Sequence, residues 1–170
     1  SIPASYAKFY PKGTYPDLTV GAYTNPGCDL FPEARYRGDA PDPINPDCAE
    51  WREQLTPAQY SVLRRQSTER PYSSPLNKEH RAGTVACKGC RQPLFSSKAK
   101  FESGTGWPSF WAPIRGAVMT RSDRSLWMAR TEVRCARCAG HLGHVFDDGP
   151  KPTGKRYCMN GVAMVFRPKA

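Results

Sequence analysis

Polar side chains recur at every second position near the C-terminus of the chain, at 156, 158 and 160, and an apolar run follows them in residues 155–166, KRYCMNGVAMVF. β-branched and aromatic residues follow a stretch rich in glycine and proline there, which predicts a turn that leads into one strand. Side chains at every second position of a strand point to the same face. We therefore expect one face of this strand to combine polar and apolar side chains: Arg156, Cys158, Asn160, Val162, Met164 and Phe166.

A short helix is predicted upstream, over residues 57–67. Thr56 suits the N-cap, Pro57 the first helical position and Gln59 the reciprocal bond of a capping box. The apolar stripe of this helix consists of Leu55, Tyr60 and Leu63. We expect the helix to have a structural role only.

The remaining pattern is typical of short strands. Residues 83–90 begin the β-rich part, and residues 114–134 predict strands that are joined by a turn at 122–125. Fourteen glycines and seventeen prolines also favour many turns over a helical bundle. The predicted fold is mainly β, with two small antiparallel sheets in a domain that spans residues 51–170.

Residues 1–50 differ in composition from this domain. They contain eight of the seventeen prolines, which exclude long helices and central strands. They also contain many aromatic residues, which argue against a disordered linker. We interpret this segment as an irregular N-terminal arm, packed with the short helix on the outside of the domain. The arm holds Cys28 and Cys48.

The formal net charge of +10 raises nucleic acid or an anionic membrane as a partner. The basic residues are scattered, however, without a run of five, and no apolar run reaches the length of a membrane span. We therefore interpret the charge as a solvated surface, and expect neither nucleic acid nor a membrane as a partner.

Four of the seven cysteines form two CxxC pairs, Cys87 with Cys90 and Cys135 with Cys138. Paired CxxC turns suit a tetrahedral zinc site. A thioredoxin-like redox pair is the alternative, but it requires a strand that leads into a helix rather than a glycine-rich turn between strands. We predict one structural Zn²⁺ that clamps two distant segments. The basic residues placed to offset its negative charge are Lys88, Arg91, Arg134 and Arg137.

Reactive side chains gather around Cys158 in residues 141–160, HLGHVFDDGPKPTGKRYCMN. Arg156 is suited to stabilising a thiolate, and His141 and His144 can supply protons near neutral pH. This composition predicts a redox or nucleophilic thiol site. A half-buried core cysteine is one alternative, although core strands avoid arginine and asparagine. The other alternative is a metal site made of His141, His144, Asp148 and Cys158.

A second candidate segment is residues 101–111, FESGTGWPSFW. Gly104 and Gly106 permit unusual backbone angles, and Pro108 stiffens the turn. Such a loop can hold Trp107 with one ring face exposed, while a core tryptophan is the alternative interpretation.

Three of these stretches together resemble the methionine-R-sulfoxide reductase (MsrB) family: GHLGHVFDDGP, GKRYCMN, and SGTGWPSF at 103–110. With the two CxxC pairs in the expected order, the resemblance covers about residues 52–168. It implies a zinc-bearing β-tent fold with a Cys₄ site and no organic cofactor. It also implies an enzyme that reduces methionine-R-sulfoxide, free or protein-bound, to methionine.

The resemblance assigns the chemistry to particular residues. Cys158 would be the nucleophile that attacks the sulfoxide sulfur and becomes a sulfenic acid. His141, His144 and Asn160 would contact the sulfoxide oxygen, on which negative charge develops.

Other residues would shape the site. By the same resemblance, Asp148 and Arg156 would tune it, and Trp107 would hold the substrate methyl group, whose partial positive charge suits an aromatic face. The reductant would be an external thiol such as thioredoxin, and a monomer is expected. Two rival functions are a binding module on the same zinc scaffold, which the presence of Cys158 argues against, and a nucleic-acid-binding zinc protein.

One departure from the family pattern concerns recycling. Many members have a resolving cysteine at the position of Thr105, which has no thiol. Three routes are therefore open for the sulfenic acid: Cys28 resolves it, Cys48 resolves it, or these two form a structural disulfide and an external thiol reduces Cys158 directly.

The start of the chain bears on its compartment. Ser1 is not an initiator methionine, and no signal peptide is visible. Because members with similar C-terminal halves include exported ones, we expect an exported, periplasmic enzyme with a removed leader, with a cytoplasmic enzyme as the alternative.

Overall fold

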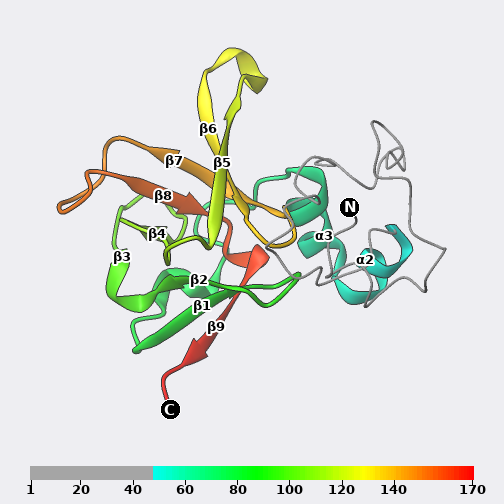
Figure 1. The fold of residues 1–170 in the computed structure, drawn as a ribbon, viewed down its shortest axis with the longest axis horizontal. Helices are drawn as coiled ribbons and strands as arrows, with labels where there is room; N and C mark the ends of the chain where they lie inside the picture. The colour runs from blue at the N-terminus through cyan, green and yellow to red at the C-terminus, as the bar shows by residue number, and fades with distance from the viewer. Residues whose placement is uncertain (1–47) are drawn as a thin grey trace, which may run out of the picture.

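A computed structural model describes residues 48–170 of the chain. Figure 1 shows two antiparallel sheets with two helices beside them, α2 (Cys48–Gln54) and α3 (Pro57–Arg65). The predicted mainly β fold with two antiparallel sheets is therefore confirmed. The packing of an arm over residues 1–50 and the pairing of Cys28 with Cys48 fall outside the described part of the molecule.

The smaller sheet has three strands in the order β2-β1-β9. In this sheet β1 (Gly83–Cys87) pairs with β2 (Pro93–Ser96) on one side and with β9 (Met164–Pro168) on the other. The C-terminal strand β9 thus pairs with β1, the first strand of the domain, so this sheet joins segments that are distant in sequence.

The larger sheet has six strands in the order β3-β4-β8-β7-β6-β5. Its strands are β3 (Lys100–Phe101), β4 (Ser109–Phe110), β5 (Val118–Asp123), β6 (Arg130–Cys135), β7 (His141–Phe146) and β8 (Arg156–Met159). The hairpin of β5 and β6 stands out from the rest of the molecule at the top of Figure 1. A turn between these strands was predicted at 122–125; the connection spans residues 124–129 and contains the 3₁₀ turn η4 (Ser125–Trp127).

The single strand predicted for residues 155–166 is wrong. The chain leaves the larger sheet after Met159, forms the 3₁₀ turn η5 (Gly161–Ala163) and enters the smaller sheet as β9. A Cβ atom on Gly161 would lie 1.9 Å from the Oγ atom of Ser74, so the chain turns at a point where only glycine fits. Arg156 and Cys158 share one face of β8 as expected, but Val162, Met164 and Phe166 do not continue that face.

Helix α3 forms where the sequence predicts it. The Thr56 hydroxyl accepts a hydrogen bond from the backbone N–H of Gln59, and the Gln59 side chain accepts one from the Thr56 N–H. The helix ends at Arg65 because Gln66 adopts a left-handed conformation with a φ of 58°. Helix α2 was not predicted. Two further 3₁₀ turns are η2 (Pro75–Lys78) and η3 (Ser97–Ala99).

The hydrophobic core lies between the two sheets. Phe95 of the smaller sheet stacks on Phe110 of the larger one with ring centroids 4.3 Å apart, and Tyr157 tilts against Phe95 at 6.0 Å. Leu63 of α3 and Leu142 of β7 are fully buried and close the core on the helical side. Because Tyr157 faces this core, its neighbour Cys158 must face away from it. None of the helices in residues 48–170 combines the length and apolar character that a membrane span requires.

Candidate functional site

Cys158 lies in a row of directly paired residues that crosses the larger sheet. On β8 it is opposite His144 of β7 and Ser109 of β4, and His144 is in turn opposite Glu132 of β6. Directly opposed residues of an antiparallel pair share a face and have Cβ atoms about 5 Å apart. The register of three strand pairs therefore places a thiol beside an imidazole on a rigid part of the sheet.

A small cavity of about 120 Å³ opens at this row. Four of its lining residues were predicted as site residues: Trp107, His144, Cys158 and Asn160. Four others were not: Thr68, Arg130, Gly143 and Phe146. The half-buried Trp107 thus borders the cavity and is not a core tryptophan, as the loop around it predicted.

Burial raises the pKa of the Cys158 thiol above its ordinary value, and this effect outweighs the opposing influence of the Arg156 charge and of the hydroxyl of Thr105. Arg156 is held by two hydrogen bonds to Asp148, of 2.9 and 3.0 Å, and lies over the ring of Phe146 at 4.5 Å. Asp148 itself is exposed and lines no part of the cavity. Arg156 and Asp148 are therefore placed to act on Cys158 through charge.

Thr105, the position of the departure from the family pattern, belongs to a chain of hydroxyl groups. Ser103 lies 2.8 Å from the Thr105 hydroxyl and 2.7 Å from that of Ser109, and Ser109 donates to the carbonyl of Trp107 at 3.0 Å. These bonds fix the SGTGWPSF loop against β4. They also hold the Thr105 side chain next to Cys158, where its hydroxyl partly offsets the rise in the pKa of the thiol that burial causes.

His144 is oriented by a carboxylate that the sequence reasoning missed. Its Nε2 atom lies 2.8 Å from Asp123, which also accepts a hydrogen bond from Arg130 at 3.3 Å. Burial lowers the pKa of His144 despite the hydrogen bond to Asp123. The hydrogen bonds from His144 and Ser125 and the charge of Arg130 outweigh burial at Asp123 and lower its pKa. A neutral imidazole that donates from Nε2 to an ionised Asp123 satisfies both shifts, and leaves Nδ1 as an acceptor.

His141 occupies a different environment from His144. It is only 2 % exposed, its Nδ1 atom lies 3.1 Å from the Glu132 carboxylate, and it is absent from the cavity lining. Arg134 and Gln66 also donate to Glu132, each at 2.8 Å. The two imidazole rings are 5.5 Å apart, edge to face. His141 therefore packs against His144 and does not reach the cavity that the thiol lines.

The backbone of Glu69 joins the two walls of the cavity. The backbone N–H of Glu69 donates to Oδ1 of Asn160 at 2.9 Å, and the backbone carbonyl of Glu69 accepts from Nε1 of Trp107 at 3.0 Å. Nδ2 of Asn160 donates to the carbonyl of Leu142 at 3.0 Å. The Glu69 carboxylate in turn accepts from the N–H of Val162 at 3.3 Å, which anchors residues 67–69 on η5. No side-chain pattern could have revealed Glu69, because its two contacts with the site are made by its backbone.

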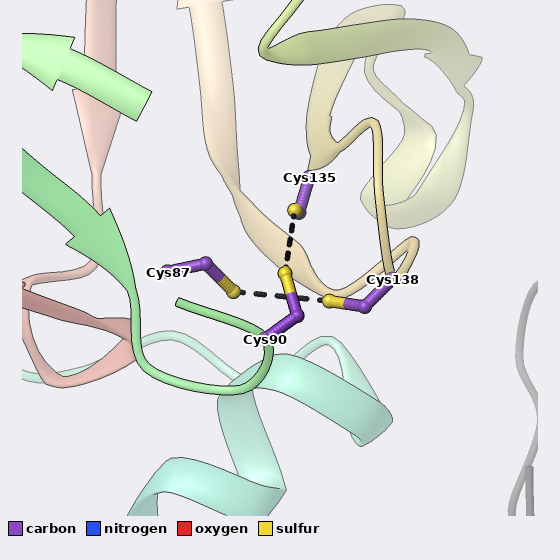
Figure 2. Close-up of side chains that lie close together, drawn as sticks. All are labelled: Cys87, Cys90, Cys135 and Cys138. Carbon is purple, nitrogen blue, oxygen red and sulfur yellow. Dashed lines mark hydrogen bonds between the residues drawn. The ribbon is translucent and has the colours of Figure 1, made fainter. Parts of the chain in front are cut away.

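The four cysteines of the CxxC pairs converge between the two sheets (Figure 2). Their sulfur atoms all lie within 4.8 Å of one another, with Cys87 3.7 Å from Cys138 and Cys90 3.4 Å from Cys135. These separations exceed a disulfide bond, and they are close to the edge of about 3.8 Å that a tetrahedron with Zn–S bonds of about 2.3 Å requires. The cluster is thus able to hold a metal ion.

The basic residues around this cluster are only partly the predicted ones. Arg137 donates to the carbonyl of Cys90 at 3.5 Å, as its position suggested, and Arg64 of α3 donates to the carbonyl of Cys138 at 2.9 Å. Arg134 instead pairs with Glu132. The alternative metal site at His141, His144, Asp148 and Cys158 is not formed: within residues 48–170, only the four cysteines bring three or more potential ligand atoms together.

Comparisons with known proteins agree with this geometry. The SelR domain model matches residues 55–168. The chain is 53% identical over 126 residues to a protein of Agrobacterium fabrum named peptide methionine sulfoxide reductase MsrB, which covers 74% of this chain and 93% of that protein. Proteins with the same name from Bradyrhizobium diazoefficiens (71% of this chain, 87% of that protein) and Methanosarcina barkeri (69% and 84%) are each 55% identical. This chain is therefore a member of the SelR domain family, and its relatives include the peptide methionine sulfoxide reductases MsrB.

Proposed function

We propose that this protein is a thiol-dependent methionine sulfoxide reductase, which converts methionine-R-sulfoxide to methionine through a sulfenic acid on Cys158. The observation that carries the proposal is the pairing of Cys158 with His144 across β7 and β8, at the wall of a cavity bordered by Trp107. The names of the relatives support the same reaction class.

His144 is suited to activating the thiol. The raised pKa keeps Cys158 protonated in the free enzyme near neutral pH, and the lowered pKa of His144 keeps that imidazole neutral. With Nε2 bound to Asp123, Nδ1 is the ring nitrogen that remains to accept the thiol proton. The imidazolium formed in this way then neighbours the sulfoxide oxygen, where negative charge develops.

The first chemical step transfers one oxygen atom. The Cys158 thiolate attacks the sulfoxide sulfur and forms a transient S–S bond while the imidazolium protonates the oxygen. The S–O bond then breaks as the hydroxyl passes to Cys158, and the S–S bond breaks as the thioether leaves. The sulfoxide is reduced by two electrons to a thioether, while the thiol is oxidised to a sulfenic acid. Asn160 supports this step, because the hydrogen bond to Leu142 occupies only one of its two Nδ2 protons.

The cavity size and lining support methionine as the reduced group. A volume of about 120 Å³ accommodates a single unbranched side chain, and Trp107 and Phe146 offer aromatic faces to the sulfoxide methyl. His141 is proposed to support the ring of His144, against which it packs. Arg156 and Asp148 are proposed to tune the charge near Cys158. Each of these three roles follows from the contacts that the side chain makes.

The cofactor and the reductant complete the proposal. The four-cysteine cluster is proposed to hold one structural Zn²⁺, whose closed coordination by four thiolates leaves no position for a substrate. An external thiol reductant, such as a thioredoxin-like protein, returns Cys158 to the thiol. A monomer remains our expectation.

A single-turnover assay tests the function. The wild-type protein, given each epimer of N-acetyl-methionine sulfoxide without reductant, should form one equivalent of thioether from the R epimer only. Cys158→Ser should form none while retaining the circular dichroism spectrum of the wild type. Cys28→Ser is the matched control and should keep the full first turnover, since both roles open to Cys28, resolving thiol and disulfide partner, lie outside the first chemical step. Binding of the sulfoxide without any turnover by the wild type would instead indicate a binding module.

A further inference from the structure

The tip of the β5–β6 hairpin carries an unusual apolar surface. Trp127 is 103 % exposed and Met128 is 61 % exposed, although both are large hydrophobic residues. Among the described residues they are the only two exposed large hydrophobics that are adjacent in sequence; the others are Tyr72 and Ile114. Both residues lie in the connection between β5 and β6, and Figure 1 shows that this hairpin stands out from the body of the domain.

The backbone at Trp127 indicates that folding alone does not account for this residue. Its φ of 62° is in the left-handed region, which bulky side chains adopt rarely and glycine adopts freely. Its ring gains nothing from burial, because the side chain is fully exposed. Strained backbone conformations of this kind cluster at active sites and ligand-binding surfaces, which makes this position a candidate for binding.

The tip is continuous with the rim of the proposed active site. Arg130, two residues after Met128, is the first residue of β6 and lines the cavity. At the rise of a strand, two residues span about 7 Å. Asp123, the last residue of β5, is paired with Arg130 next to the tip and orients His144. A molecule that reaches out of the cavity along β6 therefore meets Met128 and Trp127 next.

The cavity is too small to hold more than the sulfoxide side chain. Its volume of about 120 Å³ leaves the backbone and the neighbouring residues of a polypeptide outside, on the surface around the rim. Free methionine sulfoxide has no such neighbours. Only a polypeptide substrate would therefore reach a surface that lies about 7 Å or more beyond the rim.

We propose that Trp127 and Met128 form a docking surface for the polypeptide that carries the methionine sulfoxide. This inference rests on the proposed function and deepens it by assigning the surface that holds the polypeptide outside the cavity. Tryptophan dominates many binding surfaces, and methionine adapts to side chains of different shape. The exposed Arg124, which neighbours the tip, adds a preference for acidic residues in the segment next to the sulfoxide.

The substitution Trp127→Gly tests this surface without straining the fold, because glycine suits the positive φ at this position. Two substrates are compared with dithiothreitol as the reductant: N-acetyl-methionine-R-sulfoxide, and a short peptide with a central methionine-R-sulfoxide flanked by leucine and glutamate. We expect kcat/KM for the peptide to fall about tenfold through KM, and kcat/KM for the small substrate to stay unchanged. Ile114→Ser, which removes another exposed hydrophobic side chain, is the control and should alter neither value.

Binding is measured separately from turnover. A fluorescently labelled peptide should bind Cys158→Ser about tenfold more tightly than it binds the double variant Cys158→Ser with Trp127→Gly. An unchanged peptide affinity, or an equal loss of kcat/KM on both substrates, would overturn the docking surface. A loss that occurs only with a protein reductant, and not with dithiothreitol, would also overturn it and assign the tip to the reductant. If the wild type reduces neither substrate, the proposed function fails, while the binding comparison still decides on the surface.

Discussion

The carboxylate of Glu132 and the imidazole of His141 form a buried pair, with 3.1 Å between the carboxylate and Nδ1 and side chains that are 1 % and 2 % exposed. Arg134 completes the group with a bond of 2.8 Å to the same carboxylate. Because Glu132 is opposite His144 in the sheet, this charged cluster adjoins the histidine that is paired with the thiol. Its loss should therefore be felt in both stability and activity.

Glu132→Gln should lower the free energy of unfolding by about 3 kcal/mol, because it leaves Arg134 buried without a counter-charge. Urea unfolding at pH 7 measures this change. Glu102→Gln is the matched control, since Glu102 is 70 % exposed, and should change the unfolding free energy by less than about 0.5 kcal/mol. Equal effects of the two substitutions would contradict the role of the buried pair.

The same substitution predicts a pH dependence. Burial opposes ionisation of Glu132, but the hydrogen bonds from His141 and Arg134 outweigh it, so its pKa lies below the ordinary value of 4.5. The stabilisation is therefore present above pH 4.5 and is lost as the pH falls through the lower folded-state pKa. The stability difference between wild type and Glu132→Gln should shrink as the pH is lowered below 4.5. A difference that is constant from pH 7 to pH 3 would argue against this linkage.

Alkylation of Cys158 reports on its thiolate. Because burial raises its pKa above 9.0, modification by iodoacetamide should be slow at pH 7 and accelerate beyond pH 9. Arg156→Gln removes the main opposing charge and should slow alkylation at pH 8 by about tenfold, which corresponds to one pKa unit. Mass spectrometry of the peptide that contains Cys158 gives the rate. Lys155→Gln, which removes the neighbouring charge that pairs with Asp147, should leave the rate unchanged.

Metal content tests the four-cysteine cluster. The purified protein should contain about one zinc ion per chain, measured by plasma mass spectrometry. Cys135→Ser should lose both the metal and the cooperative thermal transition, because the ligands join the ends of β1 and β6. Cys158→Ser removes a cysteine outside the cluster and should retain full metal content. A fully folded Cys135→Ser protein without metal would show that the cluster is dispensable.

Thr105→Cys should restore a resolving thiol. The Thr105 hydroxyl neighbours Cys158, and the bonds of Ser103 hold this loop in place. After one equivalent of sulfoxide substrate without reductant, the variant should form a disulfide between position 105 and Cys158, detected by mass spectrometry. The wild type should not form that bond. Its products distinguish the three recycling routes: a Cys158 disulfide with Cys28, one with Cys48, or a persistent sulfenic acid.

Features with local causes could be predicted from the sequence, and features with distant causes could not. The capping box of Thr56 and Gln59 lies within one helical turn, and each CxxC pair lies within one tight turn, so both could be predicted from neighbouring residues alone. The end of β8 depends on the contact of Gly161 with Ser74, which belongs to another part of the chain. The environment of His141 was equally hidden, because it is set by Glu132 on the neighbouring strand.

The backbone of Glu69 makes the evolution of substrate preference and of chemistry interdependent. Asn160 accepts a hydrogen bond from the N–H of Glu69 and Trp107 donates one to its carbonyl, so a displacement of the backbone at this one residue moves both side chains. Substitutions at these two positions should therefore show epistasis rather than independent effects. Laboratory selection for a bulkier sulfoxide would succeed first in variants that change residues 67–69 together with Trp107, and would stall where only the tryptophan is randomised.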